Sequence, residues 1–242
     1  MDFGPSLQDV QVHLLGVFGK NNKKLTVWML YAFLTARATS LLATIQKGDA
    51  GTARIQLVQI FGWVAAIANH HSVNVDLEKN LRRHFPGICP SCGEVICDCK
   101  LGRLPERISQ ERLDELESRL PKVNLQYLLS NIFPDNTLEV SVAHLLAEIG
   151  ELGQEIARAS LEDEAHPKYG ARAGFLLELA DVIAHLCAVF SLLDQNFADE
   201  VLKYFADGCV VCQRKQCKCL MHEIELKKVG SRRLKGNQEG EE

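Results

Sequence analysis

The spacing of apolar and polar positions along this chain is that of a helical protein. Apolar residues recur with a period near 3.6 over about 24–47, 52–71, 138–160 and 171–193, and over shorter stretches near 76–85 and 197–206. Alternation of β-branched with polar residues, the usual signal of strands, is nearly absent. The pattern therefore predicts an all-α fold.

The helical pattern occurs twice, because the segment 18–99 matches the segment 133–219. Both copies end in cysteines spaced C-x2-C-x4-C-x-C, in CPSCGEVICDC and CVVCQRKQCKC. Between the cysteine sets the pairing includes Asn21 with Asn136, Val27 with Val142, Leu30 with Leu145, Leu57 with Leu177, Ala68 with Ala188, Arg83 with Lys203 and Phe85 with Phe205. We expect a first repeat over 1–99, a linker with a short helix over 100–124, a second repeat over 125–220 and a flexible tail over 221–242.

Four acidic residues lie in two short pairs inside strongly apolar stretches of the second copy. Glu148 and Glu151 form the first pair, and Glu178 and Asp181 form the second. A step of three residues places both members of a pair on one helix face. Burial disfavours the charged form of a carboxyl group, and four such groups together repel one another unless a cation lies among them. Ligand sets made only of oxygen suit magnesium or manganese.

The first copy lacks all four acids. The residues aligned with them are apolar: Phe33, Ala36, Val58 and Phe61. The acids are therefore dispensable for the fold, and their presence together in one copy indicates a functional site. We interpret the first copy as structural and the second as active.

The two acidic stretches, HLLAEIGELGQE and LLELADVIAHL, resemble those of the all-α nucleoside triphosphate pyrophosphohydrolases, the MazG-like superfamily with its dimeric dUTPase relatives. The resemblance covers about 125–206. It implies that Glu148, Glu151, Glu178 and Asp181 bind Mg²⁺ or Mn²⁺ and catalyse cleavage of the α–β phosphoanhydride of a (d)NTP, giving a monophosphate and pyrophosphate. Such proteins usually build their site in a homodimer, so a degenerate first repeat implies a pseudo-dimeric chain, with further homo-oligomerisation open.

Several residues near the acids are candidates for contact with substrate. His185 follows Asp181 by one helical turn, and a buried structural histidine is an equal alternative. Lys203 lies where members of the family often carry a lysine in the last helix. Lys168 and Arg172 precede the second acidic helix, although most basic residues are simply solvated. Glu155, one turn beyond Glu151, is either a further ligand or a surface residue.

Eight of the nine cysteines belong to the two spaced sets, which favours metal binding. Four thiolates packed closely suit one zinc ion in tetrahedral geometry, so we expect structural Zn²⁺ in each set. Alternatively, pairs of cysteines from both sets share one ion and join the repeats. An iron–sulfur cluster uses the same ligands, and disulfides in an oxidising compartment or free thiols are the remaining alternatives. Cys187, outside the sets, is interpreted as a small core residue. The sets are Cys89, Cys92, Cys97 and Cys99, and Cys209, Cys212, Cys217 and Cys219.

Composition and sequence pattern argue against nucleic-acid binding, membrane insertion and secretion. A net charge of -4 argues against general nucleic-acid binding, which needs concentrated Lys and Arg. The segment 175–193 approaches the length of a membrane span but contains two acids and a histidine, so we expect no membrane insertion. The first fifteen residues do not resemble a secretory signal, and we expect a cytoplasmic protein. The alternatives to a hydrolase are a non-catalytic zinc-bearing adaptor that binds nucleotide and a redox sensor that uses the cysteines.

Overall fold

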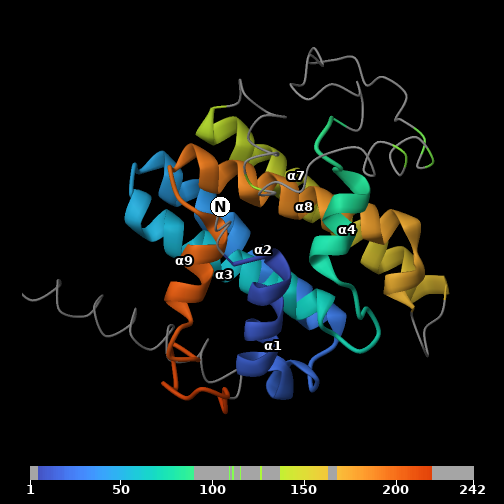
Figure 1. Ribbon diagram of the computed structural model, residues 1–242, viewed down its shortest axis with the longest axis horizontal. Helices are drawn as coiled ribbons and strands as arrows, with labels where there is room; N and C mark the ends of the chain where they lie inside the picture. The colour runs from blue at the N-terminus through green and yellow to red at the C-terminus, as the bar shows by residue number, and fades with distance from the viewer. Residues whose placement is uncertain are drawn as a thin grey trace, which may run out of the picture.

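The computed structural model describes residues 5–89, 109, 111, 115, 126, 137–162 and 168–219. These residues form α-helices and one short 3-10 helix, with no strand among them, so the all-α prediction is confirmed for this part of the chain (Figure 1). The elements are α1 (Leu7–Asn22), α2 (Val27–Gln46), α3 (Ala50–Ala68), α4 (Leu77–His84), α7 (Leu138–Glu162), η1 (Tyr169–Ala171), α8 (Ala173–Leu192) and α9 (Phe197–Tyr204).

Side-chain caps explain where several helices begin. Thr26 accepts a hydrogen bond from the Met29 N–H and starts α2, while Asp49 does the same for Thr52 at the start of α3. The helix α1 was not predicted from the apolar pattern. Its start is marked by a capping box in which Ser6 and Asp9 each bond to the other's backbone N–H.

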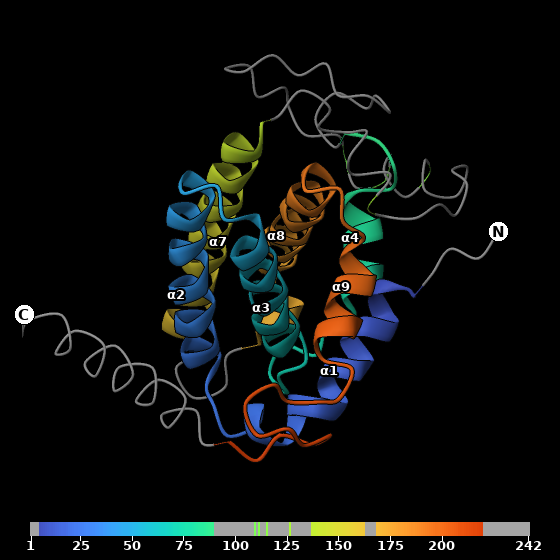
Figure 2. The same cartoon turned by 90° about the vertical axis from the view of Figure 1, so that its left-hand side faces the viewer.

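Two helical hairpins form the centre of the molecule. The hairpin α2–α3 packs against the hairpin α7–α8, with α2 beside α7 and α3 beside α8 (Figure 2). The contact between α2 and α7 is close: the Tyr31 hydroxyl donates to the Ile149 carbonyl at 3.1 Å, and a Cβ on Gly153 would collide with that hydroxyl. The largest fully buried side chains, among them Phe61, Phe175 and Phe190, fill this bundle.

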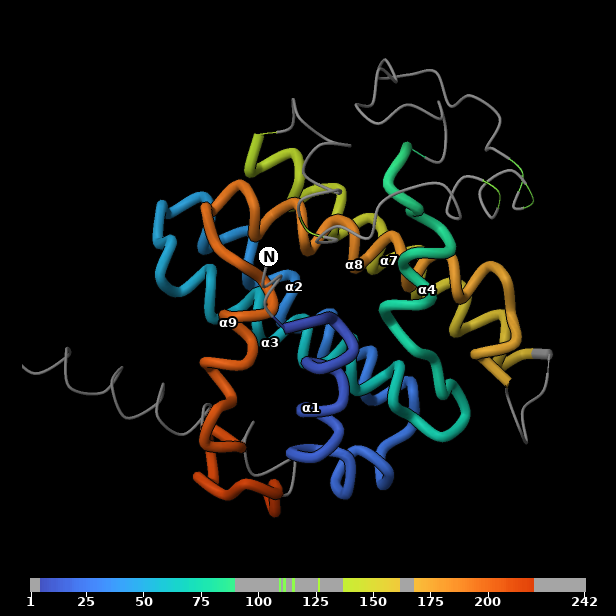
Figure 3. Tube along the Cα trace, viewed as in Figure 1, coloured from blue at the N-terminus to red at the C-terminus, as the bar shows by residue number. Residues whose placement is uncertain are grey.

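The short helices cross from one hairpin to the other. Helix α4 follows α3 in the chain but lies on α8, where the Asn80 side chain donates to the Leu176 carbonyl at 2.7 Å. Helix α9 follows α8 but lies on α3, where the Phe197 ring meets Phe61 edge-on at 4.6 Å between centroids. Helix α1 contacts both α4 and α9, and the tube in Figure 3 follows both crossings.

A glutamine side chain holds the loop before each short helix in the same way. Gln11 accepts a hydrogen bond from the Leu77 N–H at 2.9 Å and donates to the Val75 carbonyl at 2.8 Å. Gln126 accepts from the Phe197 N–H at 2.7 Å and donates to the Gln195 carbonyl at 2.5 Å.

Backbone geometry adds a second correspondence between these loops. The residue three positions before each short helix is a non-glycine residue with positive φ: Asn74 at 49° and Asp194 at 55°. Asn and Asp tolerate this left-handed region better than most residues. Helices α4 and α9 each have 8 residues and begin after a capping Asp76 or Asn196.

Three helices, α2, α3 and α8, are long and apolar enough to cross a membrane, judged by length and composition only. In the structure they pack together in the central bundle. The expectations of a cytoplasmic location and of no membrane insertion remain predictions.

Candidate metal sites

Three of the four predicted acids converge between α7 and α8. Glu148 and Glu151 lie on α7 and Glu178 on α8, and one carboxylate oxygen from each lies within 4.8 Å of the others. Glu151 is exposed, whereas Glu148 and Glu178 are half-buried against the apolar bundle. Three carboxylates this close repel one another unless a cation is bound, so the group could hold a divalent metal ion.

Asp181 does not belong to that group in this side-chain arrangement. It lies on α8 one turn beyond Glu178 and is half-buried. The i, i+3 spacing places it beside the converged oxygens on the same helix face.

Two histidines border the acidic group on the side of Asp181. The His185 Nε2 lies 3.7 Å from a Glu148 carboxylate oxygen, and the His185 ring stacks on His144 with centroids 5.4 Å apart. Burial, with a smaller contribution from His144, lowers the pKa of His185 to about 4. His185 is therefore neutral near pH 7. His144 was not singled out from the sequence, although its place one turn before Glu148 on α7 was the signal.

Glu155 lies beyond the acidic group and is paired with arginines. Its carboxylate is almost fully buried and bonds to the Arg158 guanidinium, while the Arg172 Nε lies 4.0 Å away. Glu155 is therefore part of an ion-pair network. One of its two partners, Arg172, is a residue that we predicted to bind substrate. A buried carboxylate held in this way needs no metal ion.

The two remaining predicted cations are both exposed. Lys168 precedes η1 in the connection between α7 and α8. Lys203 lies on α9, a helix that contacts α3 and α1. The side chains on either side of Lys203 in that helix bind α3. Glu200 pairs with Arg54 at 3.3 Å, and the Tyr204 hydroxyl accepts a hydrogen bond from Gln59 at 2.9 Å.

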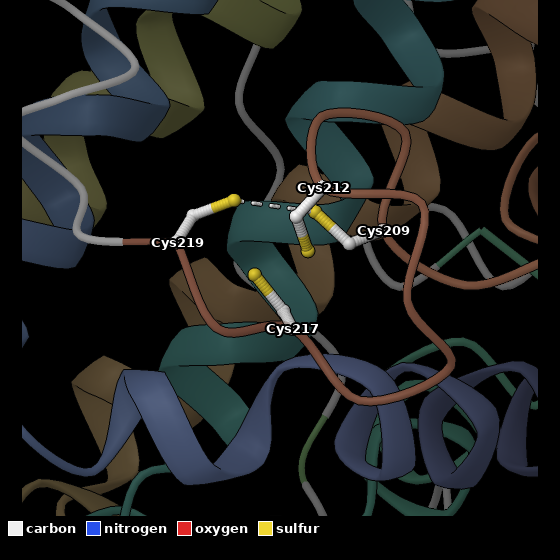
Figure 4. Close-up of side chains that lie close together, drawn as sticks. All are labelled: Cys209, Cys212, Cys217 and Cys219. Atoms are coloured by element: carbon white, nitrogen blue, oxygen red, sulfur yellow. Dashed lines mark hydrogen bonds between the residues drawn. The ribbon is translucent and has the colours of Figure 1, made fainter.

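The second cysteine set forms a compact cluster after α9. One sulfur from each of four cysteines lies within 4.8 Å of the others, and Figure 4 shows the sulfurs turned toward one another. The cluster consists of Cys209, Cys212, Cys217 and Cys219. Four thiols in this arrangement could hold a metal ion.

Tight backbone turns bring these sulfurs together. The Cys209 N–H donates to the Arg214 carbonyl at 2.9 Å, and the Gln213 N–H donates back to the Cys209 carbonyl at 2.7 Å. Gly208 has φ of 97°, and a Cβ there would collide with the Arg214 carbonyl, so the turn requires glycine.

Helix α1 supports the cluster from outside the loop. The Cys217 N–H donates to the Val17 carbonyl at 2.7 Å. The Asn21 side chain donates to the Cys217 sulfur at 3.4 Å and to the Cys219 carbonyl at 2.7 Å. An amide that donates to sulfur stabilises thiolate charge, which suits a metal ligand.

The thiols differ strongly in acidity when no metal is bound. Hydrogen bonds from the backbone of Lys218, with a smaller contribution from Arg214, lower the pKa of Cys212 to about 6. Burial raises the pKa of Cys217 to about 11 and also raises the pKa of Cys219. Of these three thiols, Cys212 is therefore the first to ionise when no metal is bound.

The first cysteine set lies mostly outside the described residues. Cys89 is buried at the end of the segment that follows α4, whereas Cys92, Cys97 and Cys99 are not described. Cys187 is fully enclosed in α8, where burial raises the pKa of its thiol to about 12. That environment agrees with a core residue that is inert toward metals and oxidants.

Comparisons with protein-family models, with curated proteins and with solved structures found no match.

Proposed function

We propose that the chain is a metal-dependent nucleotide pyrophosphohydrolase that cleaves the α–β phosphoanhydride of a (d)NTP. The observation that carries this proposal is the convergence of Glu148, Glu151 and Glu178 from two neighbouring helices. The aligned positions of the first copy are apolar, so the fold does not need these acids. The resemblance of both acidic stretches to the MazG-like pyrophosphohydrolases supports the same reaction class.

The residues present fit a magnesium or manganese site. Oxygen ligands on rigid helices suit either ion, and Asp181 supplies a fourth carboxylate on the same face as Glu178. A divalent ion bound there neutralises charge on the phosphates and lowers the pKa of a coordinated water. The His185 Nε2 lies 3.7 Å from a Glu148 carboxylate oxygen, so this side chain is placed to donate to a phosphate oxygen at the same site.

Basic groups near the start of α8 are the candidates for binding the phosphate oxygens that the metal ion does not contact. Lys168 is exposed and close in sequence to that helix. Arg172 already neutralises Glu155, so its role is to fix the connection between α7 and α8 rather than to bind substrate alone. Lys203 is the weakest of the predicted cations, because the helix that carries it lies on α3.

The duplication of the chain is part of the proposal. It is supported by the matching glutamines Gln11 and Gln126, by the matching positive φ values at Asn74 and Asp194, and by the reciprocal crossing of α4 and α9. The chain would then be a pseudo-dimer with one acidic site and a first copy that acts as its built-in partner.

Zinc is the proposed ion at the second cysteine cluster. Four sulfurs within 4.8 Å of one another, with an amide donor to the Cys217 sulfur, match a structural tetrahedral site. Elemental analysis of the purified protein should find zinc that is lost in the variant Cys212→Ser. Absorbance in the visible range would instead identify an iron–sulfur cluster.

The reaction is tested by incubating the protein with Mg²⁺ and a panel of NTPs and dNTPs and by measuring pyrophosphate separately from orthophosphate. We expect pyrophosphate release that Glu148→Gln lowers by about three orders of magnitude, because loss of a metal ligand removes several kcal/mol of transition-state stabilisation. Glu139→Gln, an exposed acid on the same helix, is the matched control and should be fully active.

Each other outcome has a definite meaning. Orthophosphate without pyrophosphate would show cleavage at another bond. An absence of turnover on every nucleotide would overturn the hydrolase and favour the nucleotide-binding adaptor. Full activity in Glu148→Gln would show that the acidic group is not the catalytic site.

A further inference from the structure

A pocket of ≈ 170 Å³ is lined by residues of both copies. It lies between α1, α2, α3 and α9 and is closed at one end by the cysteine loop, and Figure 2 shows these elements side by side. Its walls are Phe18, Asn21, Asn22, Arg37, Gln59, Gly62, Trp63, Tyr204, Phe205, Cys209, Val210, Val211 and Cys217.

Aromatic rings form much of the pocket wall and are held by one another. Phe18 meets Phe205 edge-on at 5.3 Å, and Tyr204 meets Phe205 edge-on at 4.8 Å between centroids. Trp63 stacks on Phe33 at 4.9 Å, with the two planes 23° apart. Rings fixed in this way present faces and edges suited to a flat aromatic ligand.

One cationic side chain contributes to the pocket wall. Arg37 is the one charged residue among its lining residues, which include no acid, and within the described part of the chain Arg37 forms no ion pair. Gln59 donates to the Tyr204 hydroxyl at 2.9 Å, which leaves the hydroxyl hydrogen to donate elsewhere. A guanidinium beside aromatic walls favours an anionic group on the ligand.

The two copies differ at the residues that create this space. Arg37, Gln59, Gly62 and Trp63 align with four aliphatic residues of the second copy that are fully buried: Leu152, Leu179, Val182 and Ile183. Glycine in place of valine opens room, and arginine and glutamine in place of leucine supply polar groups. The part of the pocket wall that the first copy supplies therefore has polar and small residues that the aligned positions of the second copy lack.

We propose that this pocket binds a small planar aromatic anion, with its ring against Trp63 and Phe205 and its anionic group on Arg37. The volume is close to that of a cavity of about 150 Å³ that holds benzene and is below the roughly 300–1,000 Å³ of sites for larger ligands. The ligand is therefore a single ring system with one carboxylate or phosphate, not a whole nucleotide. The inference does not rest on the proposed hydrolase activity.

Titration calorimetry with phenyl phosphate, without added divalent cation, tests the proposal. We expect saturable binding with a Kd at least about tenfold below those of benzyl alcohol and inorganic phosphate, which lack the charge and the ring respectively. Failure of phenyl phosphate to bind more tightly than both comparators would overturn the proposal.

Substitutions then locate the binding. Arg37→Gln should weaken binding at least about tenfold, because a hydrogen bond to a charged group is lost. Gly62→Val, which introduces the residue of the second copy, should fill the space and abolish binding. Gly62→Ala is the control, since a Cβ there would lie 3.8 Å from Phe205 Cζ, an ordinary contact.

A final pair of outcomes separates this pocket from the acidic site. Glu148→Gln should bind phenyl phosphate as the unsubstituted chain does, and Arg37→Gln should keep its pyrophosphate release. Wild-type affinity in both Arg37→Gln and Gly62→Val, with helical content and thermal midpoint unchanged, would place the ligand elsewhere and overturn the proposal.

Discussion

The hairpins α2–α3 and α7–α8, which we propose to be copies of one repeat, differ in the side chains at aligned positions. At four aligned positions α7–α8 carries acids where α2–α3 carries Phe33, Ala36, Val58 and Phe61. At other aligned positions the difference is reversed, and α2–α3 carries Arg37 and Gln59 where α7–α8 carries leucine. Each half therefore shows which polar residues of the other the fold does not require. Under the proposed function, the comparison distinguishes residues needed for packing from residues needed for chemistry.

The substitution with the largest expected effect replaces an acid of the second half with the residue at the aligned position of the first half. Glu178→Val introduces the residue found at position 58, which is fully buried there. We expect pyrophosphate release to fall by about three orders of magnitude, because a metal ligand is lost. The thermal midpoint without added divalent cation should stay within about 2 °C of the original, because the change removes like-charge repulsion.

Two measurements check this prediction: a pyrophosphate assay and thermal unfolding followed by circular dichroism. A large fall in the thermal midpoint would show that Glu178 supports the fold, and the comparison between the halves would then fail at this position.

The glutamines offer a test in which both halves should respond alike. Gln11→Ala and Gln126→Ala each leave a buried backbone N–H without its acceptor, at Leu77 and Phe197 respectively. We expect each change to cost about 2 kcal/mol of unfolding free energy, measured by urea denaturation. Gln8→Ala, on the exposed side of α1, is the control and should cost less than about 0.5 kcal/mol. A cost at only one of the two glutamines would contradict the equivalence of the loops.

A smaller effect should distinguish the halves by pH. His70 is buried, with Nε2 on the Leu25 carbonyl and Nδ1 accepting from Ser72, whereas the aligned residue of the second half is Phe190. Burial, with a smaller contribution from His71, lowers the pKa of His70 below 6.5. As pH falls, His70 is therefore protonated at a higher pH in the unfolded chain than in the folded chain. The free energy of unfolding then decreases as pH falls below 6.5.

Thermal unfolding at about pH 7.5 and about pH 5.5 measures that decrease. The loss of stability should be smaller in His70→Phe, which removes the titrating group. An equal loss in both proteins would assign the pH dependence to other groups.

The positions of the main helices could be read from the sequence because their apolar period is strong. The predicted stretches 24–47 and 171–193 correspond to α2 (Val27–Gln46) and α8 (Ala173–Leu192). Helix α1 was missed, although Leu7, Val10, Leu14 and Val17 recur along its buried face and Ser6 and Asp9 mark its cap. Its apolar stretch is shorter than those of α2 and α8, so its periodic signal is weaker.

The candidate sites were only partly predictable, because contacts between distant segments decide them. Spacing within one helix identified Glu148 and Glu151, and within another it identified Glu178. Spacing could not show that Asp181 lies outside the closest group or that Asn21 donates to the Cys217 sulfur. Lys203 is exposed on α9, and its proposed contact with substrate remains a prediction.

The reciprocal crossing of α4 and α9 has a consequence for how this protein can be divided or rearranged. Each hairpin is covered by a helix that the other hairpin's chain supplies, so a cut between them strips a lid from both. We therefore expect neither portion to fold alone, because deletion of the portion without the acids would expose the apolar surface of α8 that α4 covers.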